Sequence, residues 1–199
     1  VFLSPDRLIA GTSQKDQPFF ATVFENITPN VEWMRIESAE MVKHAINAFL
    51  ATSVVFANEL AEICEKTGAD VKDVERGLKT EQRIGPKAYL SAGNAFSGGT
   101  LARDIMALCS AGDQFKTNHR LFQAVNDSNT YHKRWAYHRV KEVAPTTEKP
   151  IGILGLTYKP GTDTLRRSAS LMLANDLASA GYSVVAFDPL VKQNKSTTQ

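Results

Sequence analysis

A lysine and an asparagine four residues apart, Lys43 and Asn47, lie in a stretch whose apolar residues recur at helical spacing. That spacing places both side chains on one face of a helix, one turn apart. An ammonium and an amide that point into one cleft can donate hydrogen bonds to a developing alkoxide, or exchange its proton. The alternative is an ordinary amphipathic helix whose polar face meets solvent, and spacing alone favours that alternative.

A second candidate is the glycine-rich stretch 93–104, which runs into a predicted helix from about residue 100 to 111. Glycines let a backbone approach a ligand closely, and the first N–H groups of a helix point at it. Arg103 and Asp104 would lie near that ligand in the first turn. A plain loop with Thr100 as N-cap explains the same residues equally well. The stretch is not the GxGxxG fingerprint of dinucleotide-binding turns.

A third candidate, residues 156–168, follows a short apolar run at 151–156 that is typical of a strand buried on both faces. Ligands of open α/β sheets bind at the carboxyl ends of such strands. Lys159 offers phosphate a point charge and Arg166 offers it a planar fork of donors. A basic surface loop is the alternative reading.

The helices and strands that would position these groups are predicted from the spacing of apolar residues and from capping and turn residues. A long helix is predicted from an N-cap at Ser38 to Gly68, and a short helix from 71 to 78 with Asp70 as its cap. Another long helix is predicted at 121–143. The remaining predictions are strands at 7–11, 31–36, 151–156 and 182–187, and helices around 19–25 and at 168–180. The last strand, helix and strand form a βαβ unit, which starts a parallel sheet without completing a domain.

Composition limits the classes of function. The 199 residues are 43% hydrophobic with a net charge of +2, which predicts a soluble globular protein and favours neither nucleic acid nor membrane as a partner. We expect Cys64 and Cys109 to be buried reduced thiols, which predicts a cytoplasmic location. The histidines lack partners at zinc-site spacing, so no metal is expected. Because the chain starts without Met, we expect it to be part of a longer protein.

In order and spacing, five short motifs make most of the chain resemble the UDP-glucose/GDP-mannose dehydrogenase family. The motifs are Pro5-Asp6-Arg7, Glu37–Ala51 with Asn58-Glu59, Arg83-Ile84-Gly85, Lys159–Ser168 and Asp188-Pro189. The resemblance implies an α/β fold: a mainly helical central dimerisation domain, then the start of a Rossmann-like parallel domain. We therefore expect the tail of an NAD-binding domain at 1–36, the central domain at 37–147 and part of a nucleotide-sugar-binding domain at 148–199.

The family oxidises a sugar alcohol with NAD, usually through a cysteine thiohemiacetal, and is usually dimeric through its long central helix. By resemblance, Lys43 would be the acid/base group, Asn47 an oxyanion donor, and Asp104 the residue that handles water or protons. The resemblance also implies binding residues. NAD would be contacted by Arg103 and Arg166. The nucleotide sugar would be contacted by Arg83, Phe96, Gly98, Gly99, Tyr158 and Lys159. Arg83 would reach the site of a neighbouring subunit.

One position departs from the family pattern in a way that changes the chemistry. Thr100 stands where the family has its cysteine, with Ala102 and Arg103 in place of the proline and lysine that follow it. A threonine hydroxyl is a far poorer nucleophile than a thiolate and needs a dedicated base. Cys109, further along the same helix, is not expected to substitute. The sequence therefore leaves three readings: an oxidoreductase that uses no thiohemiacetal, a degenerate nucleotide-sugar-binding or assembly homologue, and, ranked last, a helical structural domain.

Overall fold

The computed structural model of the chain describes residues 5–97, 99–158 and 161–191. The described elements are, in chain order, β1 (Leu8–Gly11), α1 (Gln17–Phe24), β2 (Val31–Met34), α2 (Ile36–Thr67), α3 (Val71–Leu78), α4 (Leu101–Phe115), α5 (Arg120–His132), α6 (Trp135–Val143), β3 (Ile151–Leu154), α7 (Ala169–Ser179) and β4 (Val184–Phe187). A mainly helical region around one long helix is followed by a short parallel α/β unit, which confirms the expected fold class.

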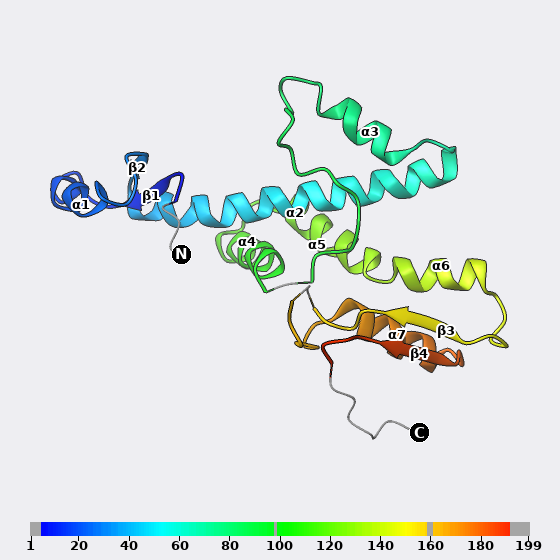
Figure 1. Ribbon diagram of the computed structural model, residues 1–199. Coiled ribbons are helices and arrows are strands. Elements are labelled where there is room, and N and C mark those ends of the chain that lie inside the picture. The colour runs from blue at the N-terminus through cyan, green and yellow to red at the C-terminus, as the bar shows by residue number, and fades with distance from the viewer. Residues whose placement is uncertain (1–4, 98, 159–160, 192–199) are drawn as a thin grey trace.

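The long helix α2 runs through the centre of the molecule, with β1, α1 and β2 at its start and α4 and α5 alongside it (Figure 1). It ends at Gly68, whose φ of +80° is the predicted left-handed cap. The prediction that Ser38 caps its start is wrong. Arg35 is the N-cap, and its carbonyl already accepts the helical N–H of Ala39 at 3.0 Å. β2 ends at Met34, so the strand feeds the helix without a separate capping turn.

The close contact between β1 and the first turn of α2 depends on a glycine. A Cβ on Gly11 would lie 2.8 Å from the Cα of Ile36 and 2.9 Å from the Cβ of Ala39. Only a residue without a side chain lets the strand approach the helix this closely. This contact fixes the direction in which α2 leaves the short parallel pair β1–β2.

The main core lies where α2 packs against α4 and α5. Small residues of α2, among them Ala48 and Ala51, face Ile105 and Cys109 of α4 and Val125 of α5. α4 continues four residues beyond the predicted end at 111, to Phe115. Its buried face extends to Gly112, so packing continues to stabilise the helix there. The first turn of α4, which carries Arg103 and Asp104, is thereby held against α2.

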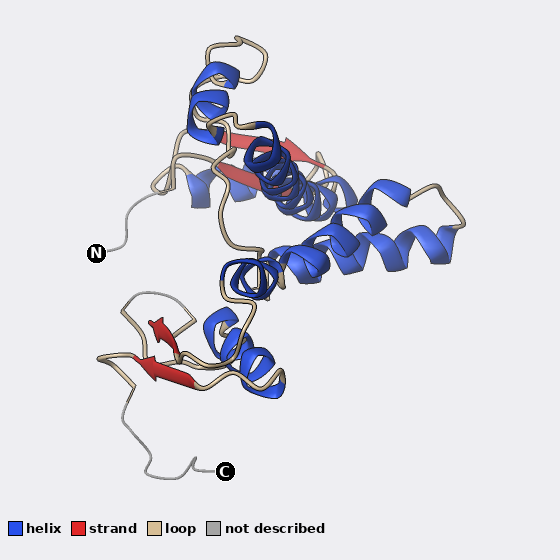
Figure 2. Ribbon diagram, turned by 90° about the vertical axis from the view of Figure 1, so that its right-hand side faces the viewer, coloured by secondary structure: helices blue, strands red, loops and turns tan. Residues whose placement is uncertain are grey.

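The helix predicted over 121–143 is two helices, α5 and α6, which meet at Lys133 and Arg134. The two helices belong to different cores. Val125 of α5 packs with α2 and α4, whereas Tyr137 and Val140 of α6 pack against the core of the C-terminal unit. Figure 2 shows that unit apart from the helices around α2. Two packing partners in different directions require the bend, which the continuous helical periodicity does not reveal.

The C-terminal unit is the predicted βαβ arrangement. β3 and β4 pair in parallel, with Ile151 opposite Val184 and Leu154 opposite Phe187. The connecting helix α7 buries Leu177 beside Ile153 and Tyr182. Both strands are shorter than predicted, because the chain leaves the ladder at Gly155, whose φ is +90°, and joins it only at Val184.

Among the described helices, α2 alone is long and apolar enough to span a membrane by length and composition. Part of its apolar surface is already buried against α4 and α5, as in the core helix of a globular protein. A second apolar stripe stays exposed, with Phe49, Phe56 and Ile63 at seven-residue spacing and exposed fractions of 72%, 49% and 59%. A seven-residue repeat of apolar side chains is the pattern of helices that pair with another helix.

Candidate functional site

Asp104 is the centre of a polar cluster between the first turn of α4 and the first half of α2. Its carboxylate is 1% exposed, and Oδ2 accepts a hydrogen bond from Nδ2 of Asn47. The other oxygen, Oδ1, lies 3.3 Å from Nδ1 of His44 and 3.5 Å from Nε of Arg103. The structure thus brings together Asn47 and Asp104 from the predicted set, and adds His44, which sequence reasoning missed.

The hydrogen bond from Asn47 lowers the pKa of Asp104, and this effect outweighs the rise caused by burial. His44 and Arg103 lower the pKa of Asp104 further. The carboxylate is therefore ionised at neutral pH and can only accept hydrogen bonds. That fixes the amide orientation of Asn47, with NH₂ toward Asp104, and leaves a second N–H for another acceptor.

Lys43 and Thr100 are near members of this cluster along their helices, Lys43 next to His44 on α2 and Thr100 one turn before Asp104. Lys43 is exposed and forms no hydrogen bond or ion pair within the described ranges, so its ammonium is free to approach a ligand. Thr100 is exposed at the N-cap position of α4, with no capping bond from its side chain. Its carbonyl accepts the N–H of Asp104 at 3.1 Å. Cys109, by contrast, is buried, and burial raises the pKa of its thiol.

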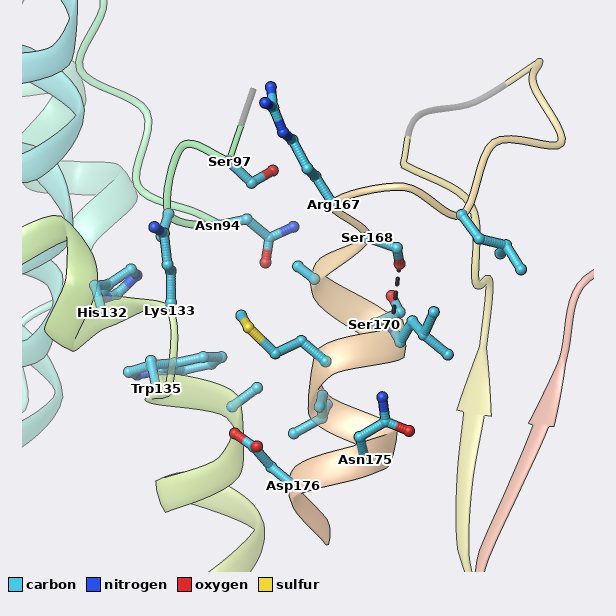
Figure 3. A pocket seen from close by; sticks show the side chains of 17 residues that line it. Asn94, Ser97, His132, Lys133, Trp135, Arg167, Ser168, Ser170, Asn175 and Asp176 are labelled. Carbon is cyan, nitrogen blue, oxygen red and sulfur yellow. Dashed lines mark hydrogen bonds between the residues drawn. The ribbon is translucent and has the colours of Figure 1, made fainter. Parts of the chain in front are cut away.

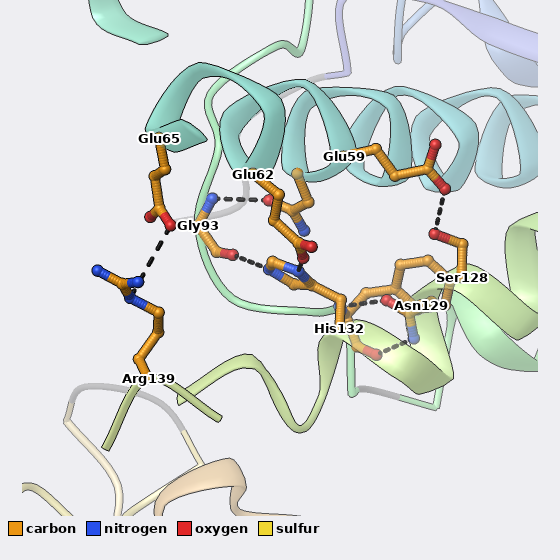
Figure 4. A network of polar contacts seen from close by, with 10 residues as sticks. Glu59, Glu62, Glu65, Gly93, Ser128, Asn129, His132 and Arg139 are labelled. Carbon is orange, nitrogen blue, oxygen red and sulfur yellow. Dashed lines mark hydrogen bonds and ion pairs between the residues drawn. The ribbon is translucent and has the colours of Figure 1, made fainter. Parts of the chain in front are cut away.

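The segment that leads into the glycine-rich turn is held by buried polar side chains of α2 and α5 (Figure 4). Asn58 accepts the N–H of Gly93 at 2.8 Å, and the carbonyl of Gly93 lies 2.9 Å from Nε2 of His132. The other nitrogen of His132 lies 2.8 Å from Glu62. Asn129 pairs with both backbone groups of buried Phe96, each at 2.9 Å. These contacts fix the backbone of residues 93–96, the first part of the glycine-rich stretch.

Asn58, Asn129 and His132 were not predicted as site residues. Asn58 belongs to a family motif but carries no assigned role there, and the sequence signal for Asn129 and His132 is a polar residue at an otherwise apolar helical position, which is also common on solvated faces. Buried side-chain amides that satisfy a loop backbone are revealed by the fold, because the loop is distant in sequence from the helices that hold it.

A cleft of about 690 Å³ separates the turn from the C-terminal unit (Figure 3). Asn94, Ser97 and the junction of α5 and α6 around Trp135 line one side, and Arg167, Ser168 and most of α7, as far as Asp176, line the other. Arg167 adopts a left-handed φ of +62°, and its Nη1 lies 2.7 Å from the place a Cβ on Gly99 would take. The sequence analysis singles out Arg166, but of these two exposed arginines it is Arg167 that lines the cleft and lies beside Gly99.

Ser168 is the N-cap of α7: its Oγ accepts the N–H of Leu171 at 3.1 Å, and the residue is 5% exposed. We expect Ser168→Ala to destabilise the full-length protein by about 1 kcal/mol, because one helical N–H loses its acceptor. Urea unfolding measures the change. Ser179→Ala, at the other end of α7, is the control and should change stability by less than about 0.5 kcal/mol. Equal effects of the two substitutions would contradict the capping role.

Asp188 positions the start of the basic loop. Its Oδ2 accepts the N–H groups of Leu156 at 2.7 Å and Thr157 at 3.0 Å. These backbone hydrogen bonds, chiefly that from Leu156, lower the pKa of Asp188. The N–H of Tyr158 then bonds to the carbonyl of Thr164 at 2.8 Å, which closes the loop.

The other predicted residues lie away from the cluster around Asp104 or outside the described chain. Arg83 is exposed and pairs with Glu81 at 2.9 Å, and Tyr158 is 41% exposed. Gly98 and Lys159 lie outside the described residues. Within the described ranges, no group of three or more His, Cys, Asp or Glu side chains could hold a metal ion.

Comparisons with known proteins identify the family of the chain. Residues 37–131 match the model of the UDP-glucose/GDP-mannose dehydrogenase family, central domain, and residues 152–199 match the family's UDP binding domain. The chain is 35% identical over 99% of its length to a UDP-glucose 6-dehydrogenase of Rickettsia bellii, and 36% identical over 97% to one of Haloferax volcanii. It covers 46% of each of these proteins, so it spans about half the length of the curated relatives it matches.

Among solved structures, that of a UDP-glucose dehydrogenase from the hyperthermophilic archaeon Pyrobaculum islandicum has a TM-score of 0.84 and 30% identity. The match covers 94% of this chain and 43% of that one. The same family is indicated by two successive domain models, by the order of the motifs and by this shared architecture. The chain belongs to the UDP-glucose/GDP-mannose dehydrogenase family.

Proposed function

We propose that the protein containing this chain is an NAD-dependent oxidoreductase that oxidises a CH–OH group of a nucleotide sugar without a thiohemiacetal. One observation carries the proposal: Asn47 and Asp104, from two helices, are hydrogen-bonded where the glycine-rich turn meets α4. Relatives with this pair of domains are named UDP-glucose 6-dehydrogenases, which supports a uridine nucleotide as the carrier of the sugar.

The roles of the individual residues follow from their surroundings. Asn47, oriented by ionised Asp104, donates its second N–H to the sugar oxygen on which negative charge develops. Lys43, exposed one helical turn before Asn47, takes up or returns the proton of that oxygen. Asp104 is too buried to meet the sugar in this arrangement and acts as a positioning residue. Thr100 lies beside them with a hydroxyl in place of a thiol.

NAD would accept the hydride, and the residues present fit only part of such a site. Of the preceding domain the described chain contributes β1, α1 and β2, and the sequence contains no GxGxxG turn to bind the pyrophosphate. The exposed guanidinium groups of Arg103 and Arg166 are suited to contact phosphates of a dinucleotide held elsewhere. We therefore expect this chain alone to be inactive.

The experiment that tests this function uses the full-length protein, offered UDP- and GDP-sugars with NAD. We expect NADH to form with at least one of them, while the isolated 199-residue chain forms none. Analysis of the product then separates aldehyde from acid. Absence of NADH with every nucleotide sugar would reject the proposal.

The alternative function is a catalytically degenerate homologue that binds nucleotide sugars or assembles with other proteins. Thr100 favours it, because the nucleophile of the family is missing. Such a protein would bind a UDP-sugar in calorimetry yet release no NADH. The hydrogen bond between Asn47 and Asp104 favours the enzyme, because a binder needs no oriented amide beside the sugar alcohol.

We further propose that two copies of the protein pair through the exposed stripe of α2. In the full-length protein, Phe49→Ala should weaken dimerisation about tenfold by removing apolar area from the interface. Analytical ultracentrifugation measures the change. Phe115→Ala is the matched control, since that side chain is 68% exposed on α4 and lies outside the stripe. A monomeric wild type, or a Phe49→Ala protein that dimerises as tightly as wild type, would contradict this interface.

The domain boundaries expected at 36/37 and 147/148 stay a proposal, with α6 as the helix that joins the central domain to the C-terminal core. We also propose a cytoplasmic location, which the two free and buried cysteines, Cys64 and Cys109, support.

A further inference from the structure

We propose that His44, oriented by Asp104, is the general base that hydrates the aldehyde intermediate, and so replaces the missing thiol of the family. The inference rests on the proposed nucleotide-sugar oxidation and assigns a role to a histidine that the reaction scheme above does not use. The observation behind it is a contact: Nδ1 of His44 lies 3.3 Å from Oδ1 of Asp104.

The two ring nitrogens of His44 have different environments. Nδ1 is buried and lies beside the carboxylate of Asp104 without a hydrogen bond to any described residue, so the charge of Asp104 acts on it through proximity, whereas the side chain as a whole is 37% exposed. Nε2 forms no hydrogen bond to any residue in the described ranges and is not among the buried unpartnered atoms, so it lies on the exposed edge of the ring. The histidine therefore has one face fixed inside the cluster and one nitrogen available to a ligand.

The charge of Asp104 selects the form of the ring that can act as a base. An ionised carboxylate favours N–H on the nitrogen that faces it, so the neutral ring carries its hydrogen on Nδ1 and a lone pair on Nε2. When Nε2 takes up a proton, the same carboxylate stabilises the imidazolium. The charged groups that lie around the ring are Asp104 and Arg103 of α4, with Lys43 and Glu40 as neighbours along α2.

The position of the pair suits a step at the sugar carbon. Asp104 lies one turn after Thr100 on α4, and its other oxygen holds Asn47, the proposed oxyanion donor. His44 and Asn47 are three residues apart on α2, which places them on neighbouring positions of one helical face. One carboxylate thus orients both a base and a hydrogen-bond donor.

The step balances without an oxidant. Nε2 of His44 removes a proton from water, the water oxygen bonds to the aldehyde carbon, and the C=O π pair moves to the carbonyl oxygen. That oxygen is stabilised by the N–H of Asn47 and receives a proton from Lys43. The products are the hydrated aldehyde, imidazolium and neutral lysine, and a proton passed through solvent restores both side chains. The hydrate is the substrate of a second oxidation in place of a thiohemiacetal.

The test uses the full-length protein and follows the two oxidations separately, with the nucleotide sugar and with its 6-aldehyde as substrates. His44→Asn is the informative variant, because its amide can keep a donor near the position of Nδ1 while removing the base. We expect aldehyde oxidation to fall by about 10²-fold or more, and alcohol oxidation to change less than about threefold. Added imidazole should restore part of the aldehyde rate.

His138→Asn is the matched control, since His138 is exposed on α6 and stacks on Tyr131. Equal loss of both oxidations in His44→Asn, without rescue by imidazole, would indicate a structural role and overturn the proposal. Release of the aldehyde as the only product of the wild type would overturn it even if the variant fails to fold. A wild type that makes no NADH overturns the proposed function, and this inference with it.

Discussion

Replacing Lys43 with alanine in the full-length protein should lower the rate of NADH formation by about 10²–10⁴-fold. The ammonium is exposed one turn before Asn47 and is the proposed group that exchanges the proton of the sugar alcohol. Because the side chain is exposed and forms no hydrogen bond or ion pair within the described part of the chain, its removal should leave folding intact. Nucleotide-sugar affinity should change less than about threefold, since the nucleotide contributes most of the binding.

Steady-state kinetics and calorimetry on the same preparation separate these effects. Lys72→Ala, an exposed lysine on α3, is the control and should keep full activity. If Lys43→Ala lowers affinity and leaves the turnover number unchanged, Lys43 binds the sugar and has no part in proton transfer. If both variants bind nucleotide sugars equally well and neither forms NADH, the protein is the degenerate homologue.

The elements with strong periodicity and clear end signals could be predicted from the sequence. α2 ends at Gly68 because a left-handed cap suits glycine, and α3 begins at Asp70, whose side chain accepts the N–H of Lys72 at 2.8 Å. Both signals act within a few residues of the chain. The start of α2 was mispredicted because the cap that a serine can offer is not used where a strand leads directly into the helix.

The break between α5 and α6 could not be predicted, because nothing local marks it. Its cause is tertiary packing. α5 packs against α2 and α4, whereas Tyr137 and Val140 of α6 pack against the C-terminal core. The ion pair of Arg134 with Asp176 at 3.6 Å links the bend to α7. Sequence periodicity reports a buried face but not which neighbour buries it.

Part of the candidate site was predictable for a different reason. The spacing of Lys43 with Asn47, the helix turn after the glycine-rich stretch and the family resemblance single out Asn47 and Asp104, and the structure places the two side chains in one hydrogen bond. His44 lies in the same motif run, and no spacing in the sequence distinguishes it. Arg167 was passed over in favour of Arg166, since the two differ only in backbone direction: a positive φ turns Arg167 toward Gly99.

The cluster around Asp104 bears on the proposal that Thr100 takes the place of the family's cysteine. A thiolate brings its own negative charge, whereas a threonine hydroxyl has to be deprotonated by a base. The negative charge in this cluster is that of Asp104, whose carboxylate accepts a hydrogen bond from the amide of Asn47 and lies beside the imidazole of His44. Removal of that charge should therefore affect both stability and chemistry, and the two effects can be measured independently.

Asp104→Asn, which keeps the size of the side chain and removes its charge, should destabilise the full-length protein by about 2 kcal/mol near neutral pH. The carboxylate is 1% exposed, and the bond from Asn47 is charge-assisted only while Asp104 is ionised. Because folding lowers the pKa of Asp104, its contribution is complete above the pKa of the unfolded chain and is lost as pH falls through the folded value. The stability difference between wild type and Asp104→Asn should thus shrink below about pH 4.

Urea unfolding at about pH 7 and about pH 3 measures this difference, and both proteins are compared at each pH. Asp113→Asn, on the same helix but with a side chain that is 74% exposed beside His119, is the control and should cost less than about 0.5 kcal/mol. A difference between wild type and Asp104→Asn that is the same at both pH values would show that the charge of Asp104 does not stabilise the cluster. The amide of Asn47 would then lack the orientation on which its role as an oxyanion donor depends.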